Sequence, residues 1–213
     1  MHRRNQWLCA GVAAALLAPA PLFAAGTGHG FYFEIGGGSG EFEWDDRDDS
    51  KDVDAALAST GYALDTAPLG PGVFNYRLNV GLALQNLDFD ADFDAEADVG
   101  GIQVDNTFGF RIVSNDRVRW WAGPSVRVGL YFGEYDADHD WIDGEDLLYH
   151  EFALGAATGV NIDLGGVILS PSVAWRSHGF AGSDDVVTDW QDDRGGDFSG
   201  NHQTMTFNTA LLF

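Results

Sequence analysis

The chain of 213 residues is the size of one domain and carries 33 acidic residues against 11 basic ones, a net charge of −22. This balance argues against nucleic acid as a partner, because phosphate contacts need a basic face. The one cysteine, Cys9, lies in the first segment, so the remainder has neither a disulfide framework nor a cysteine metal site.

The first 24 residues have the three-part form of a secretory signal peptide. Arg3 and Arg4 precede an apolar run from Trp7 to Leu17, and the segment ends in the small-residue sequence "LFAA". The apolar run is too short to cross a bilayer. We expect cleavage after Ala24, which leaves residues 25–213 as a single domain.

From there on, apolar residues recur with a period of two rather than 3.6, which predicts β-strands. In "VFNYRLNVGLAL", for example, Phe74, Leu78 and Leu82 share one face with other apolar residues, and Arg77 lies on the other. The predicted strands lie, in chain order, within 30–40, 54–66, 73–84, 101–112, 118–132, 150–162, 167–176 and 201–213.

The connections between these segments are of two kinds. Short turns occur at 68–72, 114–117 and 163–166. The other connections are long, and the windows 45–54, 88–98, 134–146 and 184–197 hold 25 of the 33 acidic residues. The pattern predicts an eight-stranded antiparallel transmembrane β-barrel with short periplasmic turns, long acidic extracellular loops and both termini in the periplasm.

A secreted β-sandwich or a lipocalin-like barrel would show the same alternation. The basic residues favour the membrane barrel, because none of them falls on an apolar face, where one arginine at the lipid midplane would cost about 2–4 kcal/mol. The five arginines in strands all fall on the polar face, namely Arg77, Arg111, Arg119, Arg127 and Arg176.

The phrases "FNYRLNVGL", "DNTFGFRI" and "VRWWAGPSVRVGL", with the final Phe213, resemble the small eight-stranded outer-membrane β-barrels of Gram-negative bacteria. These are the porin-like proteins of the OmpA, OmpX and OmpW kind. The resemblance covers residues 25–213 as a pattern. It implies residence in the outer membrane among lipid and lipopolysaccharide, as a monomer. It also implies assembly by the outer-membrane insertion machinery, with Phe213 as the assembly signal.

A barrel of eight strands is narrow enough for side chains to fill it, and buried charges must be paired. The predicted lumen network consists of Glu34, Arg77, Asp105, Arg111, Arg119, Arg127, Glu151 and Arg176. Further inward residues are Asn75, Asn79, Trp121, Tyr131, Asn161 and Asn208. This network either fills the barrel as a structural element or forms a narrow polar path.

The turn at 114–117 fixes how its two strands pair. A register that places Val113 opposite Arg119 also places Arg111 opposite Trp121 and Asp105 opposite Arg127. A shift by two residues would place Arg111 against Arg119. We expect the first register, because opposite charges across strands stabilise a sheet and like charges do not.

The segment "LDFDADFDAEADV" alternates with the opposite phase to the strand before it. This inversion predicts a β-bulge near Gln85–Asn86. We expect the strand to extend above the membrane and turn back, with an exposed edge that could pair with another chain.

One loop could bind a metal ion. In the loop 134–146, Asp136, Asp138, Asp140 and Asp143 could bind Ca²⁺ or Mg²⁺ weakly, although the glycine and glutamate of an EF-hand are missing. No other cofactor or metal is expected.

Some small outer-membrane barrels modify lipid A with a serine and a histidine. Here Ser177 and His178 are neighbours on a strand and point to opposite faces, so they cannot readily share a proton. We therefore expect a non-enzymatic barrel with a filled, charged lumen that serves membrane integrity or surface contacts. The alternative is a narrow channel for small solutes or apolar molecules, and a lipid A-modifying enzyme is the third possibility.

Overall fold

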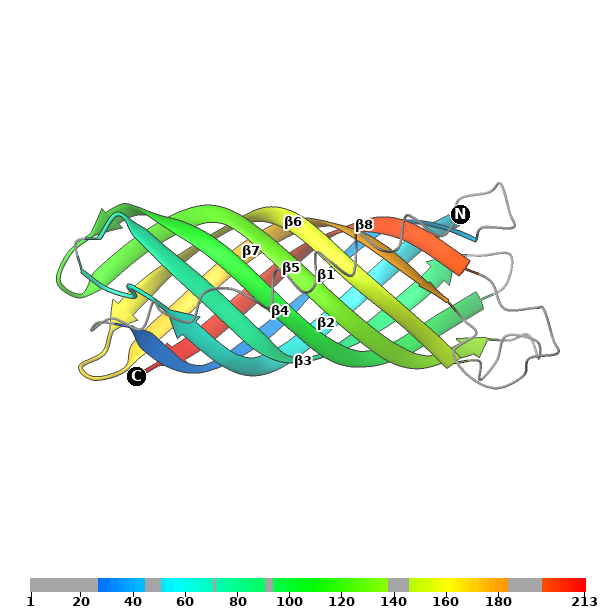
Figure 1. The fold of residues 1–213 in the computed structure, drawn as a ribbon, viewed down its shortest axis with the longest axis horizontal. Coiled ribbons are helices and arrows are strands. Elements are labelled where there is room, and N and C mark those ends of the chain that lie inside the picture. The colour runs from blue at the N-terminus through cyan, green and yellow to red at the C-terminus, as the bar shows by residue number, and fades with distance from the viewer. Residues whose placement is uncertain (1–26, 45–50, 71, 91–93, 138–145, 184–196) are drawn as a thin grey trace, which may run out of the picture.

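The computed structural model describes residues 27–44, 51–70, 72–90, 94–137, 146–183 and 197–213. Eight antiparallel strands form a closed barrel in it, which confirms the predicted fold (Figure 1). The strands are β1 (Gly28–Trp44), β2 (Lys51–Asp65), β3 (Phe74–Asp90), β4 (Asp94–Ser114), β5 (Val118–Ala137), β6 (Asp146–Asp163), β7 (Ile168–Ser183) and β8 (Asp197–Leu212). The predicted signal peptide lies outside the described residues.

Each strand pairs with its neighbours in sequence, and β8 pairs with β1 to close the barrel. At the closing seam the backbone N–H of Phe213 donates to the carbonyl oxygen of His29 at 2.8 Å. The strand predicted over 54–66 is observed as Lys51–Asp65, with every second residue buried from Val53 to Ser59. Across the described ranges, no helix is long and apolar enough to cross a membrane.

The two ends of the barrel differ in their connections. At one end, here called the turn end, the strands are joined by 66–73, 115–117 and 164–167. The side-chain Oδ1 of Asn115 accepts hydrogen bonds from the backbone N–H groups of Arg117 and Val118, at 2.9 and 2.8 Å. Such a side-chain cap stabilises a tight turn. The opposite end, here called the acidic end, carries the connections whose residues lie outside the described ranges.

An apolar belt surrounds the barrel between these ends. Its side chains point outward, and Phe31, Leu82 and Leu84 are 67 or 68% exposed. Further outward residues of the belt are Phe33, Ile35, Val80, Ile102, Phe108, Leu130, Phe132, Phe152, Leu154, Trp175, Met205 and Phe207. A soluble monomer does not expose a continuous apolar surface of this extent. The belt therefore faces lipid.

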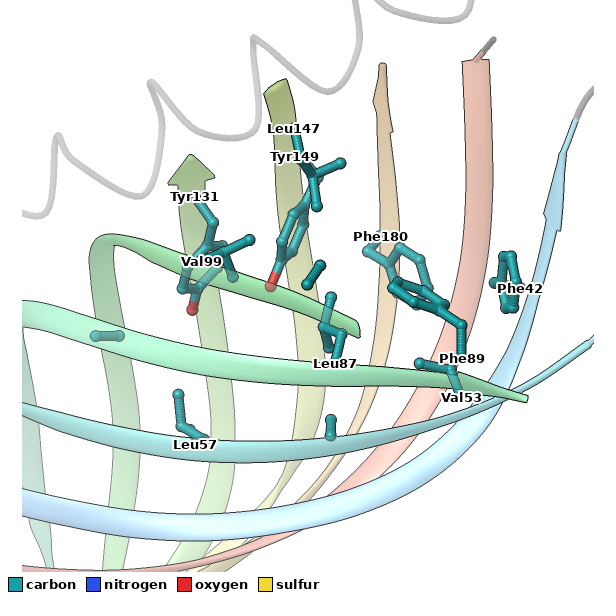
Figure 2. Close-up of a cluster of buried hydrophobic side chains, with 13 residues drawn as sticks. Phe42, Val53, Leu57, Leu87, Phe89, Val99, Tyr131, Leu147, Tyr149 and Phe180 are labelled. Carbon is teal, nitrogen blue, oxygen red and sulfur yellow. The ribbon is translucent and has the colours of Figure 1, made fainter. Parts of the chain in front are cut away.

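Toward the acidic end, the outward face of the barrel becomes polar and the inward face becomes apolar. On β3, Leu84 faces outward, but Leu87 and Phe89 face inward and are 2 and 3% exposed, whereas Asp88 faces outward. The inward apolar residues form a cluster that we call the apolar plug, shown in Figure 2: Phe42, Val53, Ala55, Leu57, Ala83, Leu87, Phe89, Ala97, Val99, Tyr131, Leu147, Tyr149 and Phe180. This end of the barrel is thus built like a soluble protein, with an apolar core and a charged surface.

The predicted bulge near Gln85–Asn86 is wrong. From Phe74 to Asp90, β3 pairs with β4 without a register shift, and its pairing with β2 is equally regular. The inverted pattern arises because the surroundings of the barrel change from lipid to water while the backbone alternation continues. Apolar side chains therefore move from the outward positions to the inward ones.

The predicted exposed edge is also wrong. The end of β3 pairs with β2, where Asp90 lies opposite Asp52, and the start of β4 pairs with β5, where Ala95 lies opposite Ala137. Both strands of this extension are therefore flanked on both sides, and no adhesive role is derived from an unpaired edge here.

The register predicted for the β4–β5 hairpin is confirmed at two of its three pairs. Asp105 lies opposite Arg127, and Arg111 lies opposite Trp121. Val113, however, lies opposite Trp120 rather than Arg119, because the register shifts by one residue between Arg111 and Val113. The turn pairs Ser114 with Arg119, and one extra residue on β4 reconciles that pairing with the register farther along.

The inward position of Leu87 can be tested by truncation. We expect Leu87→Ala to lower the free energy of unfolding by about 2–5 kcal/mol, because it leaves a cavity in the apolar plug. The exposed neighbour provides a control, and Asp88→Ala is expected to change it by less than about 0.5 kcal/mol. Urea unfolding in lipid vesicles measures both. Equal effects of the two substitutions would contradict the proposed plug.

Candidate functional site: a filled lumen

Between the turn end and the apolar plug, the lumen is filled by polar side chains in three groups, each of whose members is at most 5% exposed. The turn-end network comprises Asp65, Asn75, Arg77, Arg119, Trp121 and Asn161. The central network comprises Glu34, Gln103, Asp105, Arg127 and Arg176. The histidine cluster comprises Glu151, His178 and His202.

Arg127 connects the carboxylates of the central network. Its Nε and Nη2 donate to the two carboxylate oxygens of Asp105 at 2.8 and 3.0 Å, a bidentate pairing between adjacent strands. Its Nη2 also pairs with Glu34, which reaches across from β1. One guanidinium on β5 thus binds carboxylates from β4 and β1, and it joins distant parts of the barrel wall.

A second arginine completes the central network. Nη2 of Arg176 lies 3.0 Å from Oδ1 of Asp105, and Nη1 lies 3.9 Å from Oε2 of Glu34. The same guanidinium donates to Oγ of Ser125 at 3.1 Å. Two arginines therefore face two carboxylates, so the central network has no net charge.

In the turn-end network, Asn161 is the most connected residue. Its Oδ1 accepts hydrogen bonds from Arg77 and Trp121, both at 3.1 Å, and its Nδ2 donates to Asp65 at 3.1 Å. The guanidinium of Arg77 also lies 4.3 Å from the centre of the Trp121 ring, a cation–π contact. These contacts occupy the lumen beside the short turns.

In the histidine cluster, side chains of β6, β7 and β8 meet. Nδ1 of His178 lies 2.9 Å from Oε1 of Glu151, and Nε2 of His202 lies 3.9 Å from Oε2. The two imidazole rings stack with their centres 4.4 Å apart and an interplanar angle of 16°. Nε2 of His178 lies 2.6 Å from Oγ1 of Thr204.

The order Thr204, His178, Glu151 is that of a hydroxyl–imidazole–carboxylate relay. All three side chains, however, are 3% exposed or less. An acyl substrate on the outside of the barrel does not reach this hydroxyl. Ser177, in contrast, is exposed on the outer face while His178 is buried inside, so the two neighbours point apart.

The structure places seven of the eight residues of the predicted lumen network inside the barrel, and brings Glu34, Asp105, Arg127 and Arg176 together. Arg111, near the turn end, and Asn79, opposite Asp105 on β4, are only half-buried. Asn75, Trp121, Tyr131, Asn161 and Asn208 face inward. Of the proposed divalent-cation ligands, Asp138, Asp140 and Asp143 lie outside the described residues, and Asp136 belongs to β5.

Several lumen residues are not among those predicted from the sequence. They are Gln103, which donates to Ser59 at 2.8 Å, Asp65, which binds Asn75, and His202. The signal was nevertheless present, because Gln103 shares its strand phase with Asp105, and His178 shares it with Arg176.

No protein-family model matches the chain, and no curated protein matches it. Solved structures resemble it at low identity, and three of them are described here. The outer membrane protein OprG from Pseudomonas aeruginosa is 11% identical, with a TM-score of 0.47 over 88% of this chain and 98% of that one. Neisserial surface protein A is 11% identical, with a TM-score of 0.38 over 86% and 97%. Ail from Yersinia pestis is 10% identical, with a TM-score of 0.33 over 87% and 99%.

The central network gives a direct test. We expect Arg127→Met to lower the free energy of unfolding by about 3–5 kcal/mol, because it removes a partner from two buried carboxylates. A double variant that adds Glu34→Gln is expected to be more stable than the single variant, because it leaves Arg176 paired with Asp105 and the network again without net charge.

Urea unfolding of the refolded protein measures these changes. The control is Arg117→Ala, at an exposed turn position, for which a change below about 0.5 kcal/mol is expected. If Arg127→Met costs no more than this control, the ion pairs do not hold the barrel together.

Proposed function

We propose that this protein is a non-enzymatic outer-membrane barrel whose lumen is closed by its own side chains and whose acidic end contacts the surroundings of the cell. The observation that carries the proposal is the burial of Arg127, which has no exposed surface and pairs with carboxylates of two other strands. A conducting path would need water at this point.

A second barrier supports a closed lumen. The apolar plug lies beyond the polar networks, and its rings of Tyr131 and Tyr149 stack with their centres 4.8 Å apart. Phe42 and Phe89 meet edge to face at 4.7 Å (Figure 2). An ion that crossed the barrel would have to displace both the paired charges and the packed aromatic rings.

The acidic end is the surface available for contacts. Outward-facing, exposed carboxylates continue the strands beyond the apolar belt, and they are Glu41, Asp52, Asp54, Asp88, Glu96, Asp98 and Glu134. We propose that this end faces the exterior, with the short turns in the periplasm. Divalent cations bound weakly by its carboxylates would bridge it to anionic lipopolysaccharide.

Single-channel recording in a planar bilayer distinguishes the proposed closed barrel from the alternative, a narrow channel. We expect the refolded protein to show no steady conductance. An opened variant, with Phe89, Arg127 and Tyr131 all replaced by serine, is expected to conduct, because it removes side chains from both barriers.

Circular dichroism and gel mobility verify folding of each sample. Steady conductance of the unchanged protein that Arg127→Ala alters would overturn the proposal in favour of a channel. A folded but silent opened variant would show that these side chains are not what closes the barrel.

The non-enzymatic assignment has its own test. We expect the lipid A masses of cells that express the protein to equal those of cells that do not, because the Thr204 hydroxyl is buried inside the barrel. Mass spectrometry of extracted lipid A measures this. A loss or gain of one acyl chain that Thr204→Val abolishes would contradict the assignment.

A further inference from the structure

We propose that Glu151, His178 and His202 form an internal binding site for a divalent transition-metal ion, with zinc as the first candidate. One ligand atom of each residue lies within 4.8 Å of those of the other two. The inference does not depend on the proposed function, since a metal held inside the wall is compatible with a silent or a conducting barrel.

The distances suit a small metal ion. Tetrahedral zinc with bonds of about 2.0–2.2 Å holds its ligand atoms roughly 3.3 Å apart. The separations of Glu151 oxygens from His178 Nδ1 and His202 Nε2, 2.9 and 3.9 Å, lie on either side of this value.

The chemistry of the contacts also favours a cation. A neutral imidazole that turns a lone pair toward a carboxylate is repelled by it, so the contact between His178 Nδ1 and Glu151 is stable only with a proton or a metal ion between them. Nδ1 of His178 and Oε1 of Glu151 lie 2.9 Å apart, yet both are buried and neither has a hydrogen-bond partner among the described residues.

The surrounding residues hold the ligands in place, as outer-shell groups do in metal sites. Thr204 lies 2.6 Å from Nε2 of His178, the ring nitrogen that faces away from Glu151. Gln85 donates to Oε2 of Glu151 at 3.4 Å. The two guanidiniums of the central network are already matched by Glu34 and Asp105, so a metal ion would supply the countercharge that Glu151 lacks.

The kinds of donor select the ion. Two imidazoles and one carboxylate suit zinc, copper, nickel or iron rather than calcium or magnesium, which prefer oxygen ligands. The site therefore differs in ligand chemistry from the carboxylates of the acidic end. Because Phe180 of the apolar plug lies against His202, with ring centres 5.5 Å apart, we expect the metal to enter during folding.

The test is refolding with Zn²⁺, followed by removal of loosely bound metal and measurement of the zinc content. We expect about one ion per chain. Glu151→Gln and His202→Gln are each expected to weaken binding by more than about 100-fold, since losing even an outer-shell partner costs 10–100-fold. His150→Gln is the matched control, because this histidine is adjacent to Glu151 but lies on the other face of β6.

Electron paramagnetic resonance of the unchanged protein refolded with Cu²⁺ provides a readout that needs no variant. Coupling to two imidazole nitrogens would support the site. A spectrum of oxygen ligands alone, absence of stoichiometric zinc, or retention of zinc in both folded variants would overturn the proposal.

Discussion

The exterior of this barrel changes from lipid to water along its length, and this change governs the chemistry of every strand. Alternate residues of a strand face opposite sides of the sheet. Beside lipid, outward residues such as Leu84 must be apolar, and polar groups have a place only inside. Nearer the acidic end, Leu87 faces inward and Asp88 outward on the same uninterrupted strand. The regularly paired strand β3 thus passes from lipid to water without a register shift.

The lipid-facing portion determines what fills the lumen. Charged side chains there cannot turn outward, so each must find its partner inside. Arg127 does so with Asp105 on the adjacent strand and with Glu34, a residue 93 positions earlier in the chain. Asn161 similarly reaches Asp65, 96 positions away. These contacts link β5 to β1 and β6 to β2 through the lumen.

Because these partners lie so far apart in the sequence, only part of the network could be predicted from it. Alternation predicts the strands and the inward phase, and a tight turn predicts the pairing of Asp105 with Arg127. The contact of Glu34 with Arg127 depends on strand tilt and on the stagger of barrel closure, which residue spacing does not reveal. Periodicity also shows only which residues share a face. It does not show which face is inside, so a bulge and a change of surroundings after Leu84 produce the same pattern.

The histidine cluster lies between the central network and the apolar plug. Imidazole suits such a junction, because its flat faces pack against rings while its nitrogens lie at the edge. His202 accordingly stacks on His178 and contacts Phe180, with Nε2 toward Glu151. The plug thus shields this carboxylate from water on one side, and the arginines of the central network are matched on the other. In the proposed site, a metal ion bound by the two imidazoles supplies the countercharge of Glu151.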